Sequence, residues 1–213
     1  MRARLGDIAT VSAGQSAPQG LANYTDFGIP FVKAGNLAAL IQGKSENDIQ
    51  KVSEGVAHKH KLKLFPKGTV VFAKSGMSCM KGYVHILSRD AYLVNHLAGI
   101  VPYEVESEYL KYYFEFHKPN KLVKDLAYPS IALSEIAELE IVILDQNRRQ
   151  EIIKKLDKVT DIIAKRRRQI DKLDELVKAR FAEMFGDQRI NSKRFPEMTL
   201  GESCKFFFWD RFP

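Results

Sequence analysis

The stretch that decides the fold is Gln146–Phe185, QNRRQEIIKKLDKVTDIIAKRRRQIDKLDELVKARFAEMF, which contains neither glycine nor proline. Its apolar residues recur at spacings of three and four, which predicts one uninterrupted helix. At a rise of about 1.5 Å per residue, this helix is about 60 Å long. A domain of this size needs far less to cover its core, so we expect the helix to project and to pair with another helix.

A seam of ten positions runs along the predicted helix. Eight of the ten are apolar, which favours a coiled coil over a loose amphipathic pattern. The positions are Ile152, Leu156, Val159, Ile163, Arg166, Ile170, Leu173, Val177, Arg180 and Met184.

The composition bounds the class of protein. A chain of 213 residues suffices for one domain with an extension or for two small domains, and its hydrophobic fraction of 45% allows a real core. Cys79 and Cys204 lack any metal-like spacing and fit a reducing cytosol. There is no signal peptide and no run of about 18 apolar residues, so we expect a cytoplasmic protein without a membrane span.

The net charge of +7 suggests a polyanionic partner, but the charge is unevenly distributed. Residues 1–146 carry 16 basic and 15 acidic residues, a balance of +1. Residues 147–185 carry 12 basic and 7 acidic residues, a balance of +5. A DNA-binding patch on the first part would therefore have to be assembled by folding.

Residues 1–145 read as a β-rich α+β module. We expect strands at 30–34, 69–73, 83–87, 97–101 and 139–144, because these short apolar runs are bounded by glycine, proline, serine or charge. Ser107 and Ser134 are expected to be the N-caps of two helices. Strands and helices do not alternate at βαβ spacing, which favours α+β over a doubly wound sheet.

The long helix is expected to occupy residues 146–186 and to end at Gly186. Residues 187–213 are expected to form a linker and the start of a truncated second module. The reason is that Thr199-Leu200-Gly201-Glu202 resembles Arg4-Leu5-Gly6-Asp7, although chance could supply so short a match. In this interpretation Phe206-Phe207-Phe208-Trp209 is a fragment without its core.

Six further motifs follow one another along the chain. They are Arg4–Ala9, Ile29–Leu37, Pro66–Gly76, Val94–Ile100, Pro129–Ile136 and Leu139–Leu144. No single motif is diagnostic, but their order and spacing resemble the specificity subunit of type I restriction–modification systems over residues 4 to about 205. The chain departs from that family at residues 144–150, which keep the glutamines but lack the usual prolines, so the start of the helix is blurred.

The resemblance implies how the protein works. Each specificity subunit of that family has two target-recognition domains, each reading one half of a split DNA sequence. Its long helices pair antiparallel, set the half-site spacing and dock the methyltransferase subunits. This chain resembles one such half, which implies a homodimer bound to double-stranded DNA. The resemblance also implies a non-catalytic protein without a cofactor: S-adenosylmethionine, Mg²⁺ and ATP are expected only through the methyltransferase and restriction subunits.

Arg166 has a specific consequence for such a pair. An unpaired charge buried in the seam costs roughly 3–5 kcal/mol, so Arg166 needs an acidic partner. The antiparallel copy could supply Asp161, Asp171 or Asp174, and this polar layer would set the register. A second apolar stripe beside the seam calls for a further covering surface, either the module itself or a methyltransferase helix. The stripe consists of Ile153, Ile162, Leu176 and Phe181.

No catalytic constellation is present in the sequence. It lacks the Gly-x-Gly-x-x-Gly and Gly-x-x-x-x-Gly-Lys-Ser/Thr phosphate loops, the Asn/Asp-Pro-Pro-aromatic step of amino-methyltransferases and an Asp…Glu-x-Lys nuclease cluster. Lys74-Ser75-Gly76 lacks the upstream glycine of a phosphate loop, so we interpret it as a turn. The sequence therefore predicts a protein that is not an enzyme.

The segment Ala57–Lys63 alternates histidine and lysine. In a strand, His58 and His60 would share one face, but two ligands without a third make a poor metal site, so no metal is expected. The ordinary interpretation is a solvated strand edge or loop. The functional one is a DNA-facing strand edge whose lysines meet phosphates. These lysines are Lys59, Lys61 and Lys63.

The segment 74–83 is a second candidate for contact with DNA. It joins two expected strands, so an ordinary hairpin loop is one interpretation. In the other, the loop enters a groove, where Lys74 and Lys81 contact phosphates and Ser75 or Ser78 lies near base edges.

A third candidate is the turn that contains Lys33 and Asn36. Asparagine can pair with adenine through two hydrogen bonds, but in a glycine-containing turn it is as readily structural. We expect His96, which lies in an apolar stretch, to be a hydrogen-bonded core residue, and Tyr128 to pack on the module. Two rival functions remain: a nuclease with a dispersed site, and a coiled-coil scaffold that does not bind DNA.

Overall fold

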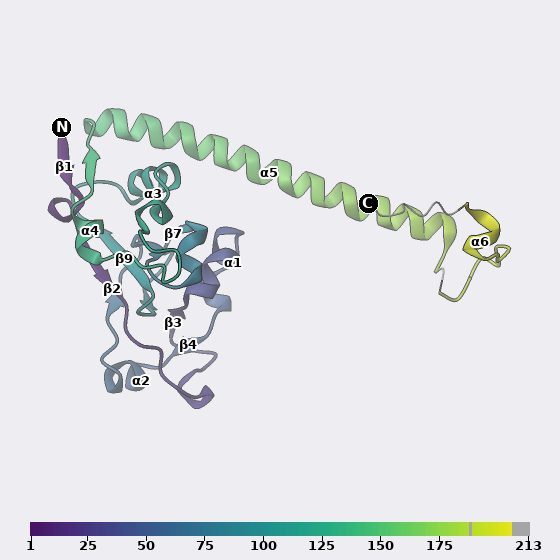
Figure 1. Cartoon of the computed structure of the whole chain (residues 1–213), viewed down its shortest axis with the longest axis horizontal. Coiled ribbons are helices and arrows are strands. Elements are labelled where there is room, and N and C mark those ends of the chain that lie inside the picture. Colours follow the sequence, from purple (N-terminus) through teal and green to yellow (C-terminus); the bar gives the residue numbers. More distant parts are fainter. Residues whose placement is uncertain (188, 206–213) are drawn as a thin grey trace, which may run out of the picture. The chain divides into compact units, whose positions relative to one another are not determined.

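The structure is a computed structural model that describes residues 1–187 and 189–205, so the run Phe206–Trp209 lies outside the described residues. The chain divides into two compact units, Met1–Ile153 and Lys154–Pro213. The first unit holds every strand that the structure describes and the short helices α1 to α4 (Figure 1). None of the described helices combines the length and apolarity needed to cross a membrane.

A four-stranded antiparallel sheet lies at the centre of the first unit. Its strand order is β2 (Ala9–Ala13), β9 (Leu97–Pro102), β6 (Val70–Ala73) and β7 (Val84–Ile86). The side chains of β6 are all buried, as expected for a continuous apolar strand between two neighbours. A Cβ atom at Gly99 would lie 2.4 Å from the ring of Phe65, so glycine here allows β9 to pack against that buried ring.

Two smaller sheets complete the unit. One has the order β4 (Lys51–Val52), β3 (Ile29–Val32), β8 (Ala91–Leu93) and β5 (Leu64–Phe65), and its central pair, β3 and β8, is parallel. The other pairs β1 (Arg2–Arg4) with β10 (Glu140–Val142) in antiparallel fashion. Because parallel strands end at the same edge of a sheet, β3 and β8 bring the residues that follow them to one place.

Helices and 3₁₀ turns cover these sheets. In α3 (Ser107–Phe116), Phe114 is buried with its ring centroid 5.1 Å from that of Phe72 on β6. The other short helices are α1 (Leu37–Ile41), α2 (Glu54–Lys59) and α4 (Leu133–Ala137). The 3₁₀ turns are η1 (Leu5–Asp7), η2 (Leu21–Asn23), η3 (Ala34–Asn36), η4 (Glu46–Asp48), η5 (Met77–Lys81) and η6 (Pro119–Leu122).

The α+β class predicted from the sequence is confirmed. All five expected strands exist, as β3, β6, β7, β9 and β10, and none of their ends is shifted by more than two residues. The prediction missed β1, β2, β4, β5 and β8, which have between two and five residues. Both expected N-caps are wrong, because Ser107 and Ser134 lie inside their helices and Glu106 and Ala132 precede them.

Glu46 is a buried carboxylate that ties η4 to the strand β7 and the turn after it. Only 2% of the residue is exposed. Its Oε1 accepts hydrogen bonds from His85 Nε2 (2.8 Å) and from the backbone N–H of Ser88 (3.0 Å), and its Oε2 accepts one from the Ser88 hydroxyl. Burial by itself raises the pKa of Glu46, but these hydrogen bonds to the charged form outweigh it and bring the pKa to about 2.

The long helix α5 runs from Gln146 to Phe185, the range predicted from the sequence. Its start is well defined despite the missing prolines, because the Asp145 side chain accepts a hydrogen bond from the Arg148 N–H (3.0 Å). Buried Arg149 then fastens the first turn: its Nε donates to Glu106 Oε2 (2.7 Å) and its guanidinium also donates to the Leu144 carbonyl (2.7 Å).

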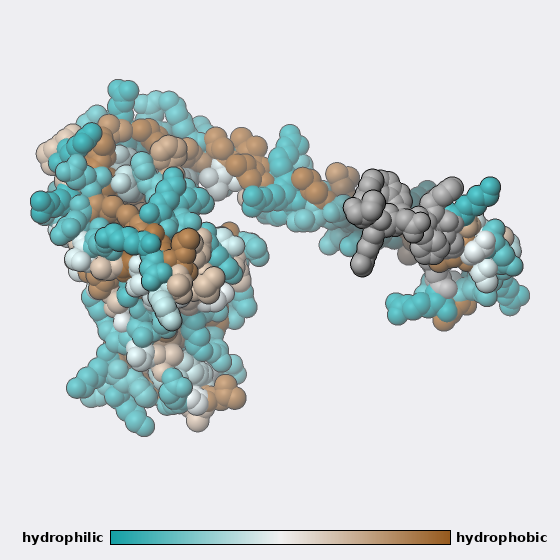
Figure 2. All heavy atoms as spheres, in the orientation of Figure 1, coloured by the Kyte–Doolittle hydropathy of each residue, from teal (hydrophilic) through white to brown (hydrophobic). Residues whose placement is uncertain are grey.

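The end of α5 is also as predicted. Gly186 has φ +70°, the left-handed conformation typical of a residue that terminates a helix, and its N–H donates to the Ala182 carbonyl (2.8 Å). The Lys193 ammonium donates to the carbonyls of Glu183 and Met184 in the last turn. The seam positions Val159, Ile163, Ile170, Leu173 and Val177 are all exposed, between 48% and 68%. Figure 2 shows hydrophobic residues, in brown, on the visible surface of the long helix.

Candidate nucleic-acid interface

Backbone hydrogen bonds gather four strand ends at one edge of the first unit. Gln15, after β2, donates to Leu93 and accepts from Asn95, with distances of 3.0 and 2.9 Å. Val94, after β8, donates to Val32 at 3.0 Å, immediately before Lys33. Lys74, after β6, donates to the His96 carbonyl at 2.9 Å. We call this group the polar edge; its members are Gln15, Lys33, Lys74, Ser75, Asn95 and His96.

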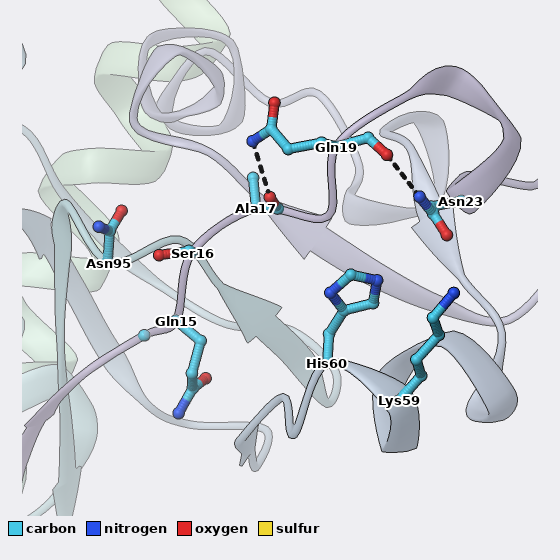
Figure 3. Close-up of a pocket in the computed structure, with 9 residues that line it drawn as sticks. Gln15, Ser16, Ala17, Gln19, Asn23, Lys59, His60 and Asn95 are labelled. Atoms are coloured by element: carbon cyan, nitrogen blue, oxygen red, sulfur yellow. Dashed lines mark hydrogen bonds between the residues drawn. The ribbon is translucent and has the colours of Figure 1, made fainter.

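A polar concavity of about 790 Å³ opens beside the polar edge (Figure 3). Its lining includes four carboxamides, from Gln15, Gln19, Asn23 and Asn95, together with Lys59 and His60. In the view of Figure 3, His60 and Lys59 rise from the end of α2, and Asn95 and Ser16 lie on the other side of the hollow. We call this concavity the amide pocket.

The wall formed by residues 14–19 depends on a close backbone approach. A Cβ atom at Gly14 would lie 1.9 Å from the Leu93 carbonyl oxygen, so only glycine allows this segment to lie against the end of β8. The Gln15 Oε1 accepts a hydrogen bond from the Lys63 N–H at 2.8 Å, and the Asn23 side chain donates to the Gln19 carbonyl at 2.5 Å. The amide pocket is therefore held by contacts between segments far apart in the sequence.

The three lysines of segment 57–63 do not share a strand face, so that part of the prediction is wrong. The Ser53 hydroxyl accepts from the Val56 N–H (3.4 Å) and caps α2, which ends at Lys59. Lys61 has φ +50° and, like Lys63, follows in a loop. Lys59 lines the amide pocket, whereas the Lys63 ammonium donates to Ser12 Oγ at 2.7 Å. His58 lies within the helix rather than on one face of a strand together with His60.

The connection 74–83 joins the paired strands β6 and β7, as expected of a hairpin, but it is not a free loop. The Ser75 hydroxyl is 2.8 Å from His96 Nδ1, and the Gly76 N–H donates to the Pro129 carbonyl at 2.9 Å. The 3₁₀ turn η5 buries Cys79, which fastens the middle of the segment. Ser78 is half-buried, and the exposed Lys81 ammonium lies 5.9 Å from the centroid of the Tyr83 ring.

The structure also shows the surroundings of four single residues discussed in the sequence analysis. The Asn36 side chain accepts from the Lys33 N–H at 2.8 Å, which is the structural role, while the Lys33 ammonium donates to Gln50 Oε1 at 2.7 Å. His96 is exposed in the turn between β8 and β9, so its predicted core position is wrong. Tyr128 is 82% exposed, so its predicted packing is wrong too, because the turn formed by residues 125–130 presents it to solvent.

This arrangement suits the recognition of a polar polyanion. Carboxamides can read base edges, above all the N6/N7 edge of adenine, and lysines can contact phosphates. From the sequence, no metal was expected at His58 and His60. The same question applies to the other histidine, cysteine and acidic side chains. Across residues 1–187 and 189–205, no three His, Cys, Asp or Glu side chains are arranged to hold a metal ion.

Most of the residues in the amide pocket were not predicted from the sequence. Gln15, Gln19, Asn23 and Asn95 were not among the predicted site residues, since each is an ordinary polar residue in a loop. The available signal was weak: a glycine, Gly14, directly after an apolar strand and before a glutamine. Only the convergence of β2, β3 and β8 makes these residues neighbours.

Comparisons with known proteins agree with this description. Residues 1–174 match the family model described as type I restriction modification DNA specificity domain. The chain is 28% identical over 195 residues to the type I restriction enzyme MjaIX specificity subunit of Methanocaldococcus jannaschii, which covers 88% of this chain and 44% of that subunit. The chain thus spans about half the length of that relative.

Solved structures show the same fold. The HsdS subunit of Thermoanaerobacter tengcongensis matches with a TM-score of 0.61 at 19% identity, covering 88% of this chain and 45% of that one. The type I restriction–modification S subunit of M. genitalium matches with a TM-score of 0.56 at 13% identity, covering 91% and 47%. Specificity subunits are the non-catalytic members of their systems and bind no cofactor themselves. This chain belongs to the family of type I restriction–modification DNA specificity domains.

Proposed function

We propose that this chain reads one half of a bipartite DNA sequence and that two copies pair antiparallel through α5, which sets the half-site spacing. In this proposal the first unit is the target-recognition domain, and its polar edge and amide pocket contact the double-stranded DNA. Methyltransferase subunits and, in the full complex, restriction subunits supply catalysis with S-adenosylmethionine, Mg²⁺ and ATP in the cytoplasm.

One observation carries the proposal: a DNA specificity domain continues into a forty-residue helix whose seam is exposed. Isolated exposed apolar residues are ordinary, but a continuous apolar seam at coiled-coil spacing is typical of a helix that pairs. The proposed pairing residues are Ile152, Leu156, Val159, Ile163, Arg166, Ile170, Leu173 and Val177.

The proposed DNA contacts rest on the polar edge and on the sequence candidates around it. Lys59 lines the amide pocket, the Lys63 N–H donates to Gln15 in its wall, and Lys74 belongs to the polar edge, so these three are the main phosphate candidates. The remaining candidates from the sequence are Lys33 and Ser75, which also belong to the polar edge, and four residues outside it: Asn36, Lys61, Ser78 and Lys81. Asn36 and Ser75 would act mainly by holding their loops, since their side chains already make hydrogen bonds.

The segment after α5 supports a modular reading of the chain. The turn α6 (Leu200–Ser203) begins at Leu200 much as η1 begins at Leu5, and both are closed by a backbone hydrogen bond to the carbonyl of that leucine. Leu5 is fully buried, whereas Leu200 is 70% exposed. We propose that residues 187–213 comprise a linker and the first turn of a second module.

The pairing is tested by Ile163→Asp combined with Leu173→Asp. Two carboxylates placed at apolar seam positions cannot be desolvated, so we expect the dimer to dissociate in sedimentation velocity while circular dichroism of the domain is unchanged. The control is Ala164→Asp with Lys172→Asp, which adds more negative charge outside the seam and should leave a dimer. A dimer that survives the seam variant would contradict the pairing.

The spacing role is tested by deleting residues 166–172 from α5. This removes one heptad, preserves the seam and brings the two domains of the proposed pair closer by roughly 10 Å, the length of about seven helical residues. At about 3.4 Å per base pair, the methylated site should lose about three base pairs between its half-sites. Methylation mapping that shows altered half-site bases at an unchanged spacing would contradict the role.

A further inference from the structure

An apolar pocket of about 220 Å³ lies inside the first unit, between α3 and the first turns of α5. Tyr109, Tyr112, Tyr113 and Phe116 line it from α3, and Ile152 and Ile153 line it from α5. A cavity of about 150 Å³ accommodates a benzene-sized ring, so this pocket can take a phenylalanine side chain.

The walls of the pocket are held in place before anything binds. The Tyr109 hydroxyl donates to the Val142 carbonyl (2.6 Å) and the Tyr113 hydroxyl to the Glu140 carbonyl (3.3 Å). Their polar ends are therefore satisfied by β10, and the rings remain as apolar walls. The Arg149–Glu106 ion pair fixes the start of α5 at the same place. Phe116 on the rim is 78% exposed.

A group of aromatic rings marks the other end of α5. The rings of Phe181 and Phe185 lie 4.8 Å apart, and that of Phe195 lies 6.1 Å from Phe185. Phe181 is 48% exposed. It follows Ile153 by 28 residues of continuous helix, or roughly 42 Å, so it cannot reach the pocket of its own chain.

The seam itself determines how two copies align. Its ten positions alternate spacings of four and three and are symmetric about residue 168, so in an antiparallel pair every seam position faces another seam position. In that register Arg166 faces Ile170 of the second copy, close to its Asp171 and Asp174. A parallel pair would instead stack Arg166 on Arg166, and like charges in a seam repel.

The second apolar stripe has nearly the same symmetry. In the register set by the seam, Ile162 lies two residues from the position opposite Leu176, and Ile153 lies two residues from the position opposite Phe181. In an antiparallel pair, flanking positions of one kind face the same kind on the partner. The second stripe of one copy therefore faces the second stripe of the other copy, and Phe181 of one copy lies near Ile153 of the other.

We propose that the pocket between α3 and α5 receives Phe181 of a second copy, backed by Phe185. This inference rests on the antiparallel pairing proposed above and adds a domain-to-helix contact at each end of the rod. Through this contact, each target-recognition domain binds the C-terminal end of α5 of the second copy. The angle between each domain and the paired helices is then determined by this contact as well as by the seam.

The first test is site-directed cross-linking in full-length protein with Cys204→Ser, since Cys204 is exposed and Cys79 is buried. One copy carries Phe116→Cys and the other Phe181→Cys, and the mixture is treated with a short bifunctional thiol reagent. We expect a linked heterodimer. As the matched control, Phe27→Cys, another exposed phenylalanine of the same unit, should not link to Phe181→Cys.

The second test is affinity. Phe181→Ala should raise the dissociation constant of the dimer at least tenfold in sedimentation equilibrium. The reason is that each of the two apolar pockets then loses the burial of one phenylalanine ring. Phe195→Ala, which this register leaves outside the pocket, should change the affinity less than twofold.

The outcomes separate the two proposals. A dimer that forms no Phe116–Phe181 link overturns the pocket assignment and leaves the helix pairing standing. A link at Phe116→Cys that appears only with an added methyltransferase subunit overturns it as well, because the occupant is then that subunit. A monomer throughout overturns the pairing itself.

Discussion

The seam of α5 and the polar edge are two proposed binding surfaces that are built in different ways. The seam draws all of its positions from residues 152–184, at spacings that any forty-residue helix would bring onto one face. The polar edge collects single side chains from around residues 15, 33, 75 and 95, and they meet only because four strands end together. A surface such as the seam needs only an intact helix. A surface such as the polar edge needs every tertiary contact that positions its side chains.

The largest expected effect is a loss of stability of the domain that carries the polar edge when the pH is lowered. The pKa of Glu46 lies at about 2, below its ordinary value of 4.5, so its stabilisation is fully present above pH 4.5 and is lost as the pH falls towards 2. At about 1.4 kcal/mol per pKa unit, this amounts to roughly 3 kcal/mol of domain stability. Chemical denaturation of the wild type and of Glu46→Gln, followed between pH 7 and pH 2, measures it.

The stability difference between these two proteins should shrink as the pH falls, because the amide does not titrate. A difference that stays constant across this pH range would show that Glu46 is not the titrating group.

Gly14→Ala should separate the regions more directly. A Cβ atom there would overlap the Leu93 carbonyl, so residues 14–19 must move and the amide pocket deforms, at a cost of about 1–3 kcal/mol. We expect loss of half-site discrimination in a competition binding assay with unchanged sedimentation as a dimer. Gly55→Ala is the matched control, since no atom lies within 4 Å of the added carbon. Intact discrimination in Gly14→Ala would remove the amide pocket from the recognition surface.

The smallest effects distinguish base contacts from phosphate contacts within the polar region. Asn95→Ala should cost roughly 1–3 kcal/mol on the preferred half-site and little on random duplex. Lys59→Ala should weaken both duplexes alike and lower the slope of log affinity against log salt by about one. Titrations of both variants at several salt concentrations measure this. If Lys59→Ala instead weakened only the preferred half-site and Asn95→Ala weakened both duplexes, Lys59 would be the base contact and Asn95 the phosphate contact.

The sequence was informative where local rules dominate. The bounds of α5 followed from an unbroken periodic stretch and a terminal glycine, and five strands followed from apolar runs between turn residues. The two N-caps failed by one or two residues: Glu106 precedes the first helix and binds Arg149, and Ala132 precedes the second helix and donates its N–H to Glu135. The strand edge considered as one interpretation of residues 57–63 is wrong at Lys59, because Ser53 caps a helix that ends there.

For the candidate site, the residues predicted by motif were only partly those that the structure brings together. Lys59, Lys74 and Ser75 fall at the amide pocket or the polar edge, but Asn36 is used to hold its own turn. His96 and Tyr128 are exposed although their sequence neighbours are apolar or small, because each lies at the tip of a turn.

By itself, the sequence determined the helix, its seam, the α+β class and the resemblance to the specificity family, since each follows from the spacing of residues along the chain. The tertiary structure alone decided which amides share a concavity, which lysines surround it and that an aromatic pocket flanks the start of α5. The physical reason is that these features depend on hydrogen bonds and packing between residues tens of positions apart, and no local pattern encodes which of those pairs will meet.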